Sequence, residues 1–185
     1  MEFFTALNDD HRAFIAKQPV FFVATAADSA RINLSPKGMD AFRVLSPTQV
    51  GYLDVGGSGN ETHAHLAADG RITMMMCAFD RPALIFRLYG HGRAVLPQDV
   101  DWAETAAHFT LLPGTRQIFL VDLDSIQESC GWGVPFMSFD RERGTLSKYH
   151  AQQDPTERLT KIAERTSSID GLPVRVQTLM PFEQG

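Results

Sequence analysis

Four short segments of the sequence combine glycines, cationic side chains and hydrogen-bonding groups, a combination that suits an anionic or planar ligand. The first segment is Asn33-Leu34-Ser35-Pro36-Lys37-Gly38, in which Lys37 stands between a proline and a glycine. Little side-chain volume near this lysine would block a ligand. A hairpin turn with a solvated lysine is the simpler explanation of the string taken alone, so the segment gains meaning only with partners from elsewhere in the chain.

The second segment is a glycine-rich turn that leads into a predicted helix, Asp54-Val55-Gly56-Gly57-Ser58-Gly59-Asn60-Glu61-Thr62. Glycines let backbone N–H groups approach an anion, and a helix N-terminus adds unpaired donors and the positive end of the helix dipole. The glycine spacing matches neither a dinucleotide-binding fingerprint nor a Walker loop. A capping box formed by Ser58 and Glu61 explains the same residues structurally, and both interpretations stay open.

The third segment, Arg87-Leu88-Tyr89-Gly90-His91-Gly92-Arg93, belongs to a predicted long strand. Arg87 stands between Phe86 and Leu88, so side-chain alternation predicts that it points inward while its neighbours face the other side. A buried arginine needs an anionic partner, because an unpaired buried charge is costly. A salt bridge at a sheet edge or at an interface is the alternative.

The fourth segment is Ser129-Cys130-Gly131-Trp132-Gly133-Val134-Pro135, a bend that carries a large flat ring between two glycines. Such a ring can cover a planar cofactor or fill a dimer interface. Cys130 could serve as a nucleophile, but the sequence sets no acid or histidine beside it. A buried, inert thiol is the commoner role of a free cysteine.

Charge and hydropathy exclude several classes of function. The chain has 17 Lys and Arg against 22 Asp and Glu, a net charge of -5, which argues against a chain-wide nucleic-acid or anionic-membrane footprint. The N-terminus lacks the pattern of a signal peptide. The longest apolar run, 74–79, is far shorter than the roughly 20 residues that span a bilayer. These features predict a cytoplasmic protein that binds neither nucleic acid nor membrane.

Metal binding and disulfide bonding have little support in the sequence. His63 and His65 are two positions apart on a predicted helix and so lie on different faces, which is poor geometry for a metal site. Cys77 and Cys130 form neither a disulfide framework nor a CxxC pair. We therefore expect two reduced thiols and no metal.

The elements that must position these segments are mostly strands. Apolar runs and two-residue alternation predict strands at 20–25, 31–35, 41–45, 49–55, 71–79, 83–95 and 116–126. Short helices are expected at 8–18, 60–68, 99–109 and 155–165. Strands joined by hairpin-length connections indicate an antiparallel barrel or sandwich rather than alternating βαβ units, and the long strands between 71 and 95 favour the barrel. No linker divides the chain, so we expect a single domain.

Taken in order, the four segments resemble the pyridoxamine 5'-phosphate oxidase-like family of FMN-binding split β-barrels, and a small branch of it in particular. The string from Phe22 to Ala26 through Asn33–Gly38 is similar to the first cofactor-facing strands of that family. Tyr52-Leu53-Asp54 with residues 57–62 resembles its phosphate-side helix start. Residues 69–73, 87–90, 129–135 and 168–173 complete the likeness, which covers about residues 15–175.

The resemblance implies a mainly β fold, a six-stranded antiparallel split β-barrel. Residues 1–185 would form one FMN-binding domain with a C-terminal helical extension from about residue 150. It also implies a homodimer with FMN at the subunit interface and an FMN-dependent oxidoreductase of unidentified substrate, with NAD(P)H as a possible partner. Non-enzymatic flavin binding or sensing, or a split barrel that binds haem or the deazaflavin F420, are the alternatives.

In this interpretation Asn33 and Ser35 hydrogen-bond the edge of the isoalloxazine ring, and Lys37 either favours reduced flavin or holds phosphate. Asn60, the N–H of Glu61, and Thr62 meet the phosphate, and Trp132 from the partner covers one flavin face. The chain has Glu61 and Thr62 where pyridoxamine phosphate oxidases carry basic residues, so the positive charge must come from Lys37, Arg31, Arg71 or Arg87, with Arg87 as the first choice. No catalytic residue is assigned. The predicted cofactor-binding residues are Arg31, Asn33, Ser35, Pro36, Lys37, Gly38, Asn60, Glu61, Thr62, Arg87, Cys130 and Trp132.

Overall fold

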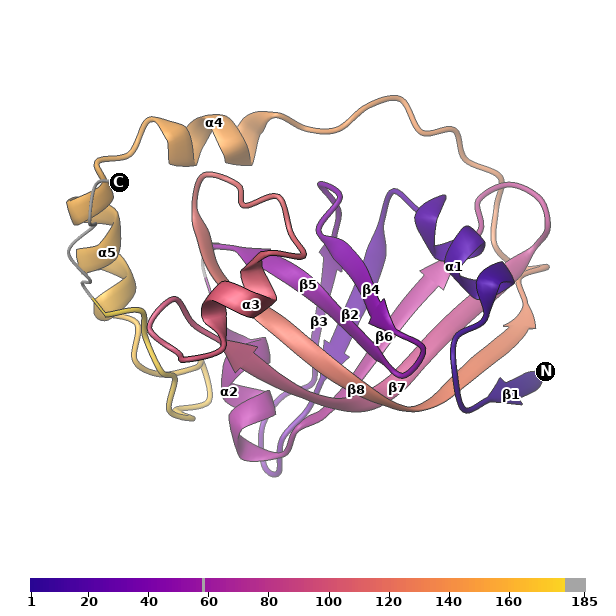
Figure 1. Ribbon diagram of the computed structural model, residues 1–185, viewed down its shortest axis with the longest axis horizontal. Coiled ribbons are helices and arrows are strands. Elements are labelled where there is room, and N and C mark those ends of the chain that lie inside the picture. The colour runs from indigo at the N-terminus through magenta and orange to yellow at the C-terminus, as the bar shows by residue number, and fades with distance from the viewer. Residues whose placement is uncertain (58, 179–185) are drawn as a thin grey trace.

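The computed structural model describes residues 1–57 and 59–178, and its centre is one antiparallel sheet (Figure 1). Seven strands follow one another in the order β3-β2-β6-β7-β8-β5-β4, and β1 pairs with β8 off this path. The strands are β1 (Glu2–Phe4), β2 (Phe21–Thr25), β3 (Asn33–Lys37), β4 (Phe42–Ser46), β5 (Gln49–Val55), β6 (Arg71–Cys77), β7 (Leu84–Val95) and β8 (Thr115–Cys130).

The sheet curls into a split barrel. Phe21 on β2 packs edge-on against Phe42 on β4 and Tyr52 on β5, with ring centroids 5.1 and 5.5 Å apart. Because β2 and β5 are separated along the sheet by β6, β7 and β8, this contact requires the sheet to close around a common interior. Within the described residues β3 and β4 end the path, which leaves the barrel split between them.

The mainly β, antiparallel fold is therefore as predicted, but the strand count is not. The sheet has eight strands rather than six, in part because β1 pairs with the outer end of β8 through only three residues, Glu2 to Phe4. A three-residue strand is too short to show an alternating pattern. The last four residues of β8, Gln127 to Cys130, extend past the predicted end at 126, and two of them pair with β1.

Strands β7 and β8 are the two longest strands of the barrel and pair with each other. Their register shifts between Tyr89 and Gly90, where a β-bulge increases the twist. A Cβ atom at Gly90 would clash with the carbonyl oxygen of Asp122, so the bulge requires glycine. Phe86 and Leu88 of β7 point into the core with almost no exposed surface.

Five short helices surround the barrel: α1 (Asp9–Ala16), α2 (Glu61–Ala68), α3 (Trp102–Ala106), α4 (Thr145–Ala151) and α5 (Pro155–Ala163). Asn8 caps α1, and its side chain accepts the N–H of His11. Helix α3 is shorter than the 99–109 expected. Helix α4 was not predicted, because it has no side-chain cap and buries none of its residues. No described helix is both long enough and apolar enough to span a membrane.

The start of α2 differs from the predicted capping box. Ser58 lies outside the described residues, and Asn60 occupies the N-cap position without a capping side-chain bond. The carboxylate of Glu61 accepts the backbone N–H of Ile169 at 3.1 Å instead. Glu61 therefore ties the helix to a distant C-terminal loop rather than to its own first turn.

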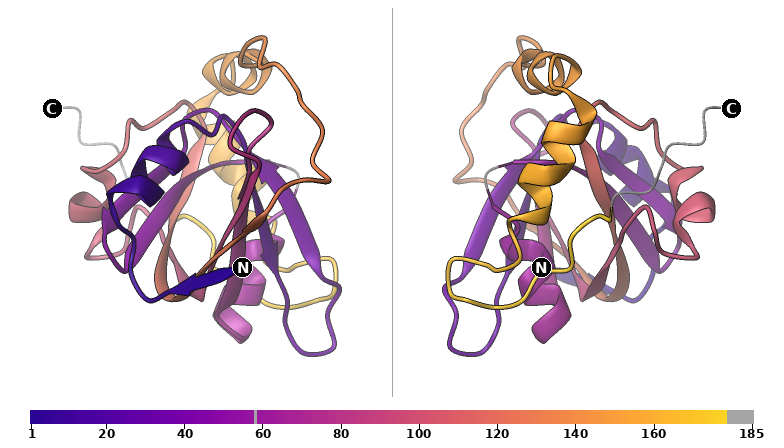
Figure 2. Two further views of the ribbon diagram at one scale, coloured as in Figure 1. Left: turned by 90° about the vertical axis from the view of Figure 1, so that its right-hand side faces the viewer. Right: turned by 90° about the vertical axis from the view of Figure 1, so that its left-hand side faces the viewer.

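The chain leaves β8 and crosses the outside of the barrel before it forms α4 and α5 (Figures 1 and 2). His150 of α4 contacts the carbonyl oxygen of Gly56 at 2.7 Å, and Arg165 donates to the carbonyl of Gly57 at 2.7 Å. These bonds hold the C-terminal helices against the glycine-rich turn that precedes α2. The same turn belongs to the candidate site.

Candidate functional site

A cavity of about 380 Å³ lies between β3, the end of β5 and the start of α2. We name it the β3–α2 cavity. It brings together two of the predicted segments that are about twenty residues apart in the sequence. Its lining includes seven of the predicted cofactor-binding residues, namely Asn33, Ser35, Pro36, Lys37, Asn60, Glu61 and Thr62.

A chain of hydrogen bonds fixes the polar groups of β3 in this cavity. The side-chain amide of Asn33 donates to the hydroxyl of Thr62 at 3.1 Å and to that of Thr25 at 3.3 Å. Ser35 donates to the side-chain oxygen of Asn33 at 3.3 Å, and Thr25 is bonded to the buried ring of His65 at 3.1 Å. Strand β3 is thereby clamped to the first turn of α2, and Asn33 has one defined orientation.

Asp54 binds the two cationic side chains, Lys37 and Arg116, that line the cavity. Its carboxylate is almost fully buried and accepts two N–H groups of Arg116, at 2.9 and 2.8 Å. Lys37 Nζ lies 3.6 Å from the other carboxylate oxygen. Arg116 also donates to the carbonyl of Gly59 at 3.0 Å. Two cations share one carboxylate, so this cluster carries a net positive charge beside the glycine-rich turn.

Arg116 is the main residue of the cavity that the sequence interpretation missed. It begins a predicted strand and was assigned no role, because it stands between Thr115 and Gln117 and lacks the apolar neighbours that singled out Arg87. The pairing of β5 with β8 brings Arg116 to Asp54, its neighbour across 62 positions of sequence. Spacing alone gives no sign of that pairing.

A second polar network lies beneath the cavity and includes His63. The side-chain amide of Gln117 donates to Asp54 and Asn60, at 2.9 and 2.7 Å, while its oxygen accepts from Nδ1 of His63 at 2.7 Å. Nε2 of His63 accepts the backbone N–H of Arg175 at 3.2 Å. Burial lowers the pKa of His63, and the nearby cations Arg175 and Arg116 add to this effect. The ring is therefore held neutral.

The two histidines of α2 face different partners. His63 contacts Gln117 and His65 contacts Thr25, so the prediction that they do not share a face is correct. In the described part of the chain no group of three or more His, Cys, Asp or Glu side chains could hold a metal ion.

Arg87 is the clearest correction at the level of single residues. It does not point inward: Phe86 and Leu88 fill the core, and Arg87 lies on the outer face of the sheet, where it donates to Ser129 at 3.0 Å. Tyr89 donates to Gln127 on the same face at 2.9 Å. Alternation correctly predicts that Arg87 and its two neighbours point to opposite faces of the sheet. The face toward the core is, however, that of Phe86 and Leu88.

The remaining predicted residues lie outside the β3–α2 cavity of the single chain. Arg31 is paired with the carboxylate of Asp170. Gly38 packs near the carbonyl of Pro19 and the side chain of Glu142. Cys130 is exposed at the end of β8, and Trp132, also exposed, follows it in the next bend. The single chain therefore assembles the first two predicted segments and leaves the third and fourth elsewhere.

Comparison with known sequences gives matches over most of the chain, not only over these four segments. The family model described as pyridoxamine 5'-phosphate oxidase matches residues 7–130. A curated relative from Aspergillus flavus, the pyridoxamine 5'-phosphate oxidase family protein ustO, is 37% identical over 176 residues, which cover 92% of this chain and 70% of the relative.

Solved structures show the same fold at low sequence identity. A candidate pyridoxamine 5'-phosphate oxidase from Lactobacillus delbrueckii superposes with a TM-score of 0.54 at 13% identity, covering 67% of this chain and 95% of that one. HupZ from Group A Streptococcus gives a TM-score of 0.52 at 17% identity, covering 66% of this chain and 93% of that one. The shared part corresponds to about two thirds of this chain.

Proposed function

The chain belongs to the pyridoxamine 5'-phosphate oxidase family, and from this premise we propose that it binds FMN in the β3–α2 cavity and acts as an FMN-dependent oxidoreductase. The observation that carries the proposal is the meeting of three features in one cavity. These are the fixed polar edge of β3, the N-terminus of α2 and the net positive cluster around Asp54. A ligand with a planar polar ring and a phosphate needs all three.

The residues present fit the phosphate end of FMN. The N–H groups at the start of α2 are unpaired donors at the positive end of a helix dipole. A Cβ atom at Gly57 would meet no atom within 4 Å, so the turn leaves open space for an anion. Arg116 supplies the cation, and the carboxylate of Glu61 is occupied by the N–H of Ile169. This bond holds the Glu61 carboxylate in place but leaves its negative charge, so the cations Arg116 and Lys37 must offset Glu61 and Asp54 as well as the phosphate.

The residues also fit the ring end. Asn33 and Ser35 present an amide and a hydroxyl whose directions are set by their mutual bonds and by Thr62. Lys37 brings a positive charge to the end of β3 and stabilises negative charge that develops there. When bound, FMN supplies the redox chemistry, whereas the protein supplies binding, orientation and charge. Lys37, Asn33 and Ser35 are binding and orienting residues in this proposal.

The proposal includes a homodimer in which the partner chain completes the site. Trp132 is strongly exposed, and Arg87 lies on the outer face of the sheet. Neither reaches the β3–α2 cavity of its own chain, so each can contribute only across a subunit interface. An exposed tryptophan next to other exposed apolar residues is typical of such an interface.

Binding is tested with the purified full-length chain. We expect a visible flavin absorption band, FMN identified by mass spectrometry of the released chromophore, and quenching of FMN fluorescence on titration. Lys37→Ala should weaken FMN binding about tenfold, or about 1.4 kcal/mol. Lys17→Ala, at the end of α1 and outside the cavity, is the matched control.

The outcomes separate the alternatives. Bleaching of the flavin band by NADPH or NADH without oxygen supports an oxidoreductase, whereas bound FMN that no reductant bleaches indicates a flavin-storage or sensing protein. A chain that binds no FMN but takes up haem or F420 contradicts the proposed cofactor. Equal affinities of the two lysine variants would contradict the proposed cavity.

A further inference from the structure

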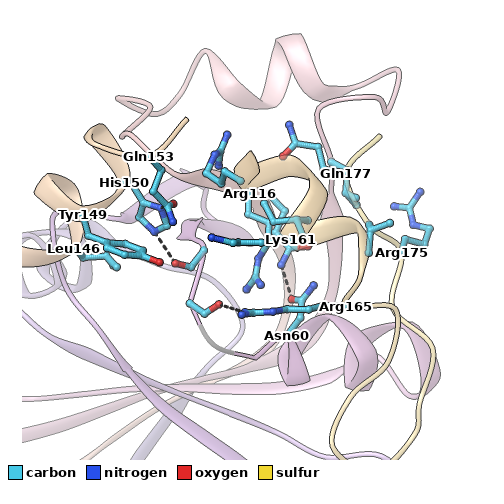
Figure 3. A pocket seen from close by; sticks show the side chains of 17 residues that line it. Asn60, Arg116, Leu146, Tyr149, His150, Gln153, Lys161, Arg165, Arg175 and Gln177 are labelled. Atoms are coloured by element: carbon cyan, nitrogen blue, oxygen red, sulfur yellow. Dashed lines mark hydrogen bonds between the residues drawn. The ribbon is translucent and has the colours of Figure 1, made fainter. Parts of the chain in front are cut away.

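A second cavity, of about 330 Å³, lies on the other side of the glycine-rich turn, between the barrel and the C-terminal helices (Figure 3). We name it the α5 cavity. The barrel contributes Gly56, Asn60 and Arg116, and most of the remaining lining comes from residues 146–177. That segment lies beyond the residues matched by the family model, 7–130. The cavity is thus largely a property of the part of this chain outside the family match.

The α5 cavity is strongly cationic. Its lining includes five basic side chains and no Asp or Glu: Arg116, Arg158, Lys161, Arg165 and Arg175. In Figure 3 the side chains of Lys161 and Arg165 extend toward the glycine-rich turn, on the side where Arg116 also lies. Like charges gathered in a partly closed space repel one another, so the arrangement costs free energy unless an anion offsets it.

Some of these cations already have carboxylate partners, and one does not. Arg116 binds Asp54, Arg175 binds Asp99, and Lys161 binds Glu157 one turn earlier on α5. Among the described residues Arg158 contacts no carboxylate, and its guanidinium donates only to the carbonyl of Thr115, at 3.5 Å. Burial lowers the pKa of Arg158, as expected for a cation without a compensating anion.

The rest of the lining is apolar and aromatic, with Leu96, Leu146, Tyr149, Ile162 and Val176. The side-chain oxygen of Gln177, also in the lining, is buried and has no hydrogen-bond partner within the described ranges. An inorganic ion would leave the apolar wall unused. A molecule with an anionic group on an apolar body would use the cations and the wall together.

We propose that the α5 cavity binds a small organic anion, a phosphate ester or carboxylate on an apolar or aromatic body, as a ligand separate from the flavin. The two cavities meet at Gly57, Asn60 and Arg116, so this anion would lie next to the flavin site. Its binding does not require the flavin, because Arg158, Lys161 and the apolar wall line the α5 cavity and not the β3–α2 cavity.

The test is isothermal titration calorimetry of the full chain with phenyl phosphate, benzoate, inorganic phosphate and phenol, with and without saturating FMN. Phenyl phosphate or benzoate should bind at least about tenfold more tightly than inorganic phosphate or phenol, because only the first two combine charge and body. Arg158→Gln and Lys161→Gln should each weaken that binding about fivefold to twentyfold. The better of phenyl phosphate and benzoate identifies the phosphate or the carboxylate class.

Arg43→Gln is the matched control, because Arg43 is a half-buried arginine that pairs with Asp40 and lines neither cavity. It should leave the affinity unchanged, and thermal unfolding should show that all three variants are folded. The proposal is overturned if none of the four probes binds, or if Arg158→Gln and Lys161→Gln both bind like the unaltered chain. Complete displacement of the anion by FMN would also overturn it, because the cavity would then belong to the flavin phosphate. If FMN does not bind, the flavin titration shows it. The anion titration without FMN then still tests the α5 cavity.

Discussion

Asp54 is the residue on which the candidate flavin site depends. It joins Lys37 from β3 and Arg116 from β8, and through Gln117 it is linked to His63 of α2. A buried carboxylate with charged and neutral donors is stabilised by all of them, and removing one donor leaves the buried carboxylate of Asp54 partly unsatisfied. The cluster therefore fixes the positions of two cations that would otherwise repel each other.

Replacement of Arg116 should separate the phosphate end of the cavity from the ring end. Arg116→Gln removes the cation of the β3–α2 cavity that bonds to the glycine-rich turn at Gly59, so FMN affinity should fall about tenfold to hundredfold, or about 1.4–2.8 kcal/mol. Riboflavin, which has no phosphate, should lose less than about threefold. Fluorescence quenching with both ligands measures the two losses.

Two further variants control this experiment. Lys37→Ala should weaken FMN and riboflavin about equally and shift the flavin reduction potential downward, because this lysine acts at the ring. Arg116→Lys keeps the charge and should recover part of the FMN affinity. Equal losses of FMN and riboflavin in Arg116→Gln would show that Arg116 supports the cavity without contacting the phosphate.

His63 should make stability depend on pH. Burial lowers its pKa in the folded chain, whereas in the unfolded chain the pKa returns to about 6.5. Below that value the unfolded chain takes up the proton first, so the free energy of unfolding decreases as the pH falls. Protonation would also remove the acceptor that Nε2 offers to the N–H of Arg175.

Denaturant unfolding between pH 7 and pH 5 measures this contribution. His63→Gln should make the pH dependence shallower, by at most about 1.4 kcal/mol per pH unit, the value for one proton. His108→Gln, which removes an exposed histidine, should leave the slope unchanged. An identical slope in His63→Gln and the unaltered chain would exclude His63 as the source.

Site residues that belong to one short segment of the sequence were predicted more readily than site residues that only the folded chain brings together. Asn33, Lys37 and Thr62 were identified from spacing and turn chemistry, and the structure brings them into one cavity. Arg116 was missed because its role depends on the β5–β8 pairing. Arg87 was assigned the wrong face because strand alternation fixes which residues lie together but not which set faces the core.

At the scale of elements, helix α5 is attached to the protein through a narrow contact. Leu159 is its only buried residue, and Asp154 caps its N-terminus by accepting the N–H of Glu157. Arg158, Lys161 and Ile162 of this helix line the α5 cavity. A helix that buries so little apolar surface depends on each buried side chain, and its docking can be lost without unfolding of the barrel.

Leu159→Ala should therefore release α5 selectively. Leucine-to-alanine changes at buried positions cost roughly 2–5 kcal/mol, which exceeds what the rest of the helix can supply. Hydrogen–deuterium exchange should show lost protection in 155–163 while β7 and β8 keep theirs. Ile169→Ala, which shortens an exposed side chain, is the control. Loss of protection throughout the barrel would show that α5 and the barrel unfold together.

Elements with strong patterns were predicted well and weakly patterned ones poorly. Strand β5 has the predicted bounds, and β2, β6 and β7 differ by only one or two residues at an end. These strands bury apolar side chains on at least one face, which produces the pattern in the sequence. Helix α4 and strand β1 bury little or nothing, so their positions are set by neighbouring segments that local sequence does not reveal.

For the whole molecule, the distribution of exposed apolar side chains is the feature that a single chain does not explain. The bend and extended segment after β8 expose Trp132, Phe136, Met137 and Phe139, by 86, 72, 60 and 61% respectively. Large apolar side chains gathered in one segment are costly in water and mark an interaction surface. The outer face of β7 and β8 also carries the ordered group of Arg87, Ser129, Tyr89 and Gln127.

We therefore expect sedimentation equilibrium at micromolar concentration to give twice the chain mass of 20.5 kDa. Trp132→Ala should raise the dissociation constant of the dimer about thirtyfold or more, the effect of losing an aromatic hot spot worth at least about 2 kcal/mol. If Trp132 also covers the partner's flavin, FMN affinity in this variant should depend on protein concentration and recover when the chain is concentrated. Val100→Ala, which trims an equally exposed apolar residue elsewhere, should change neither quantity. A 20.5 kDa species that binds FMN fully would contradict both the dimer and the contribution of Trp132, because the β3–α2 cavity would then be complete in one chain.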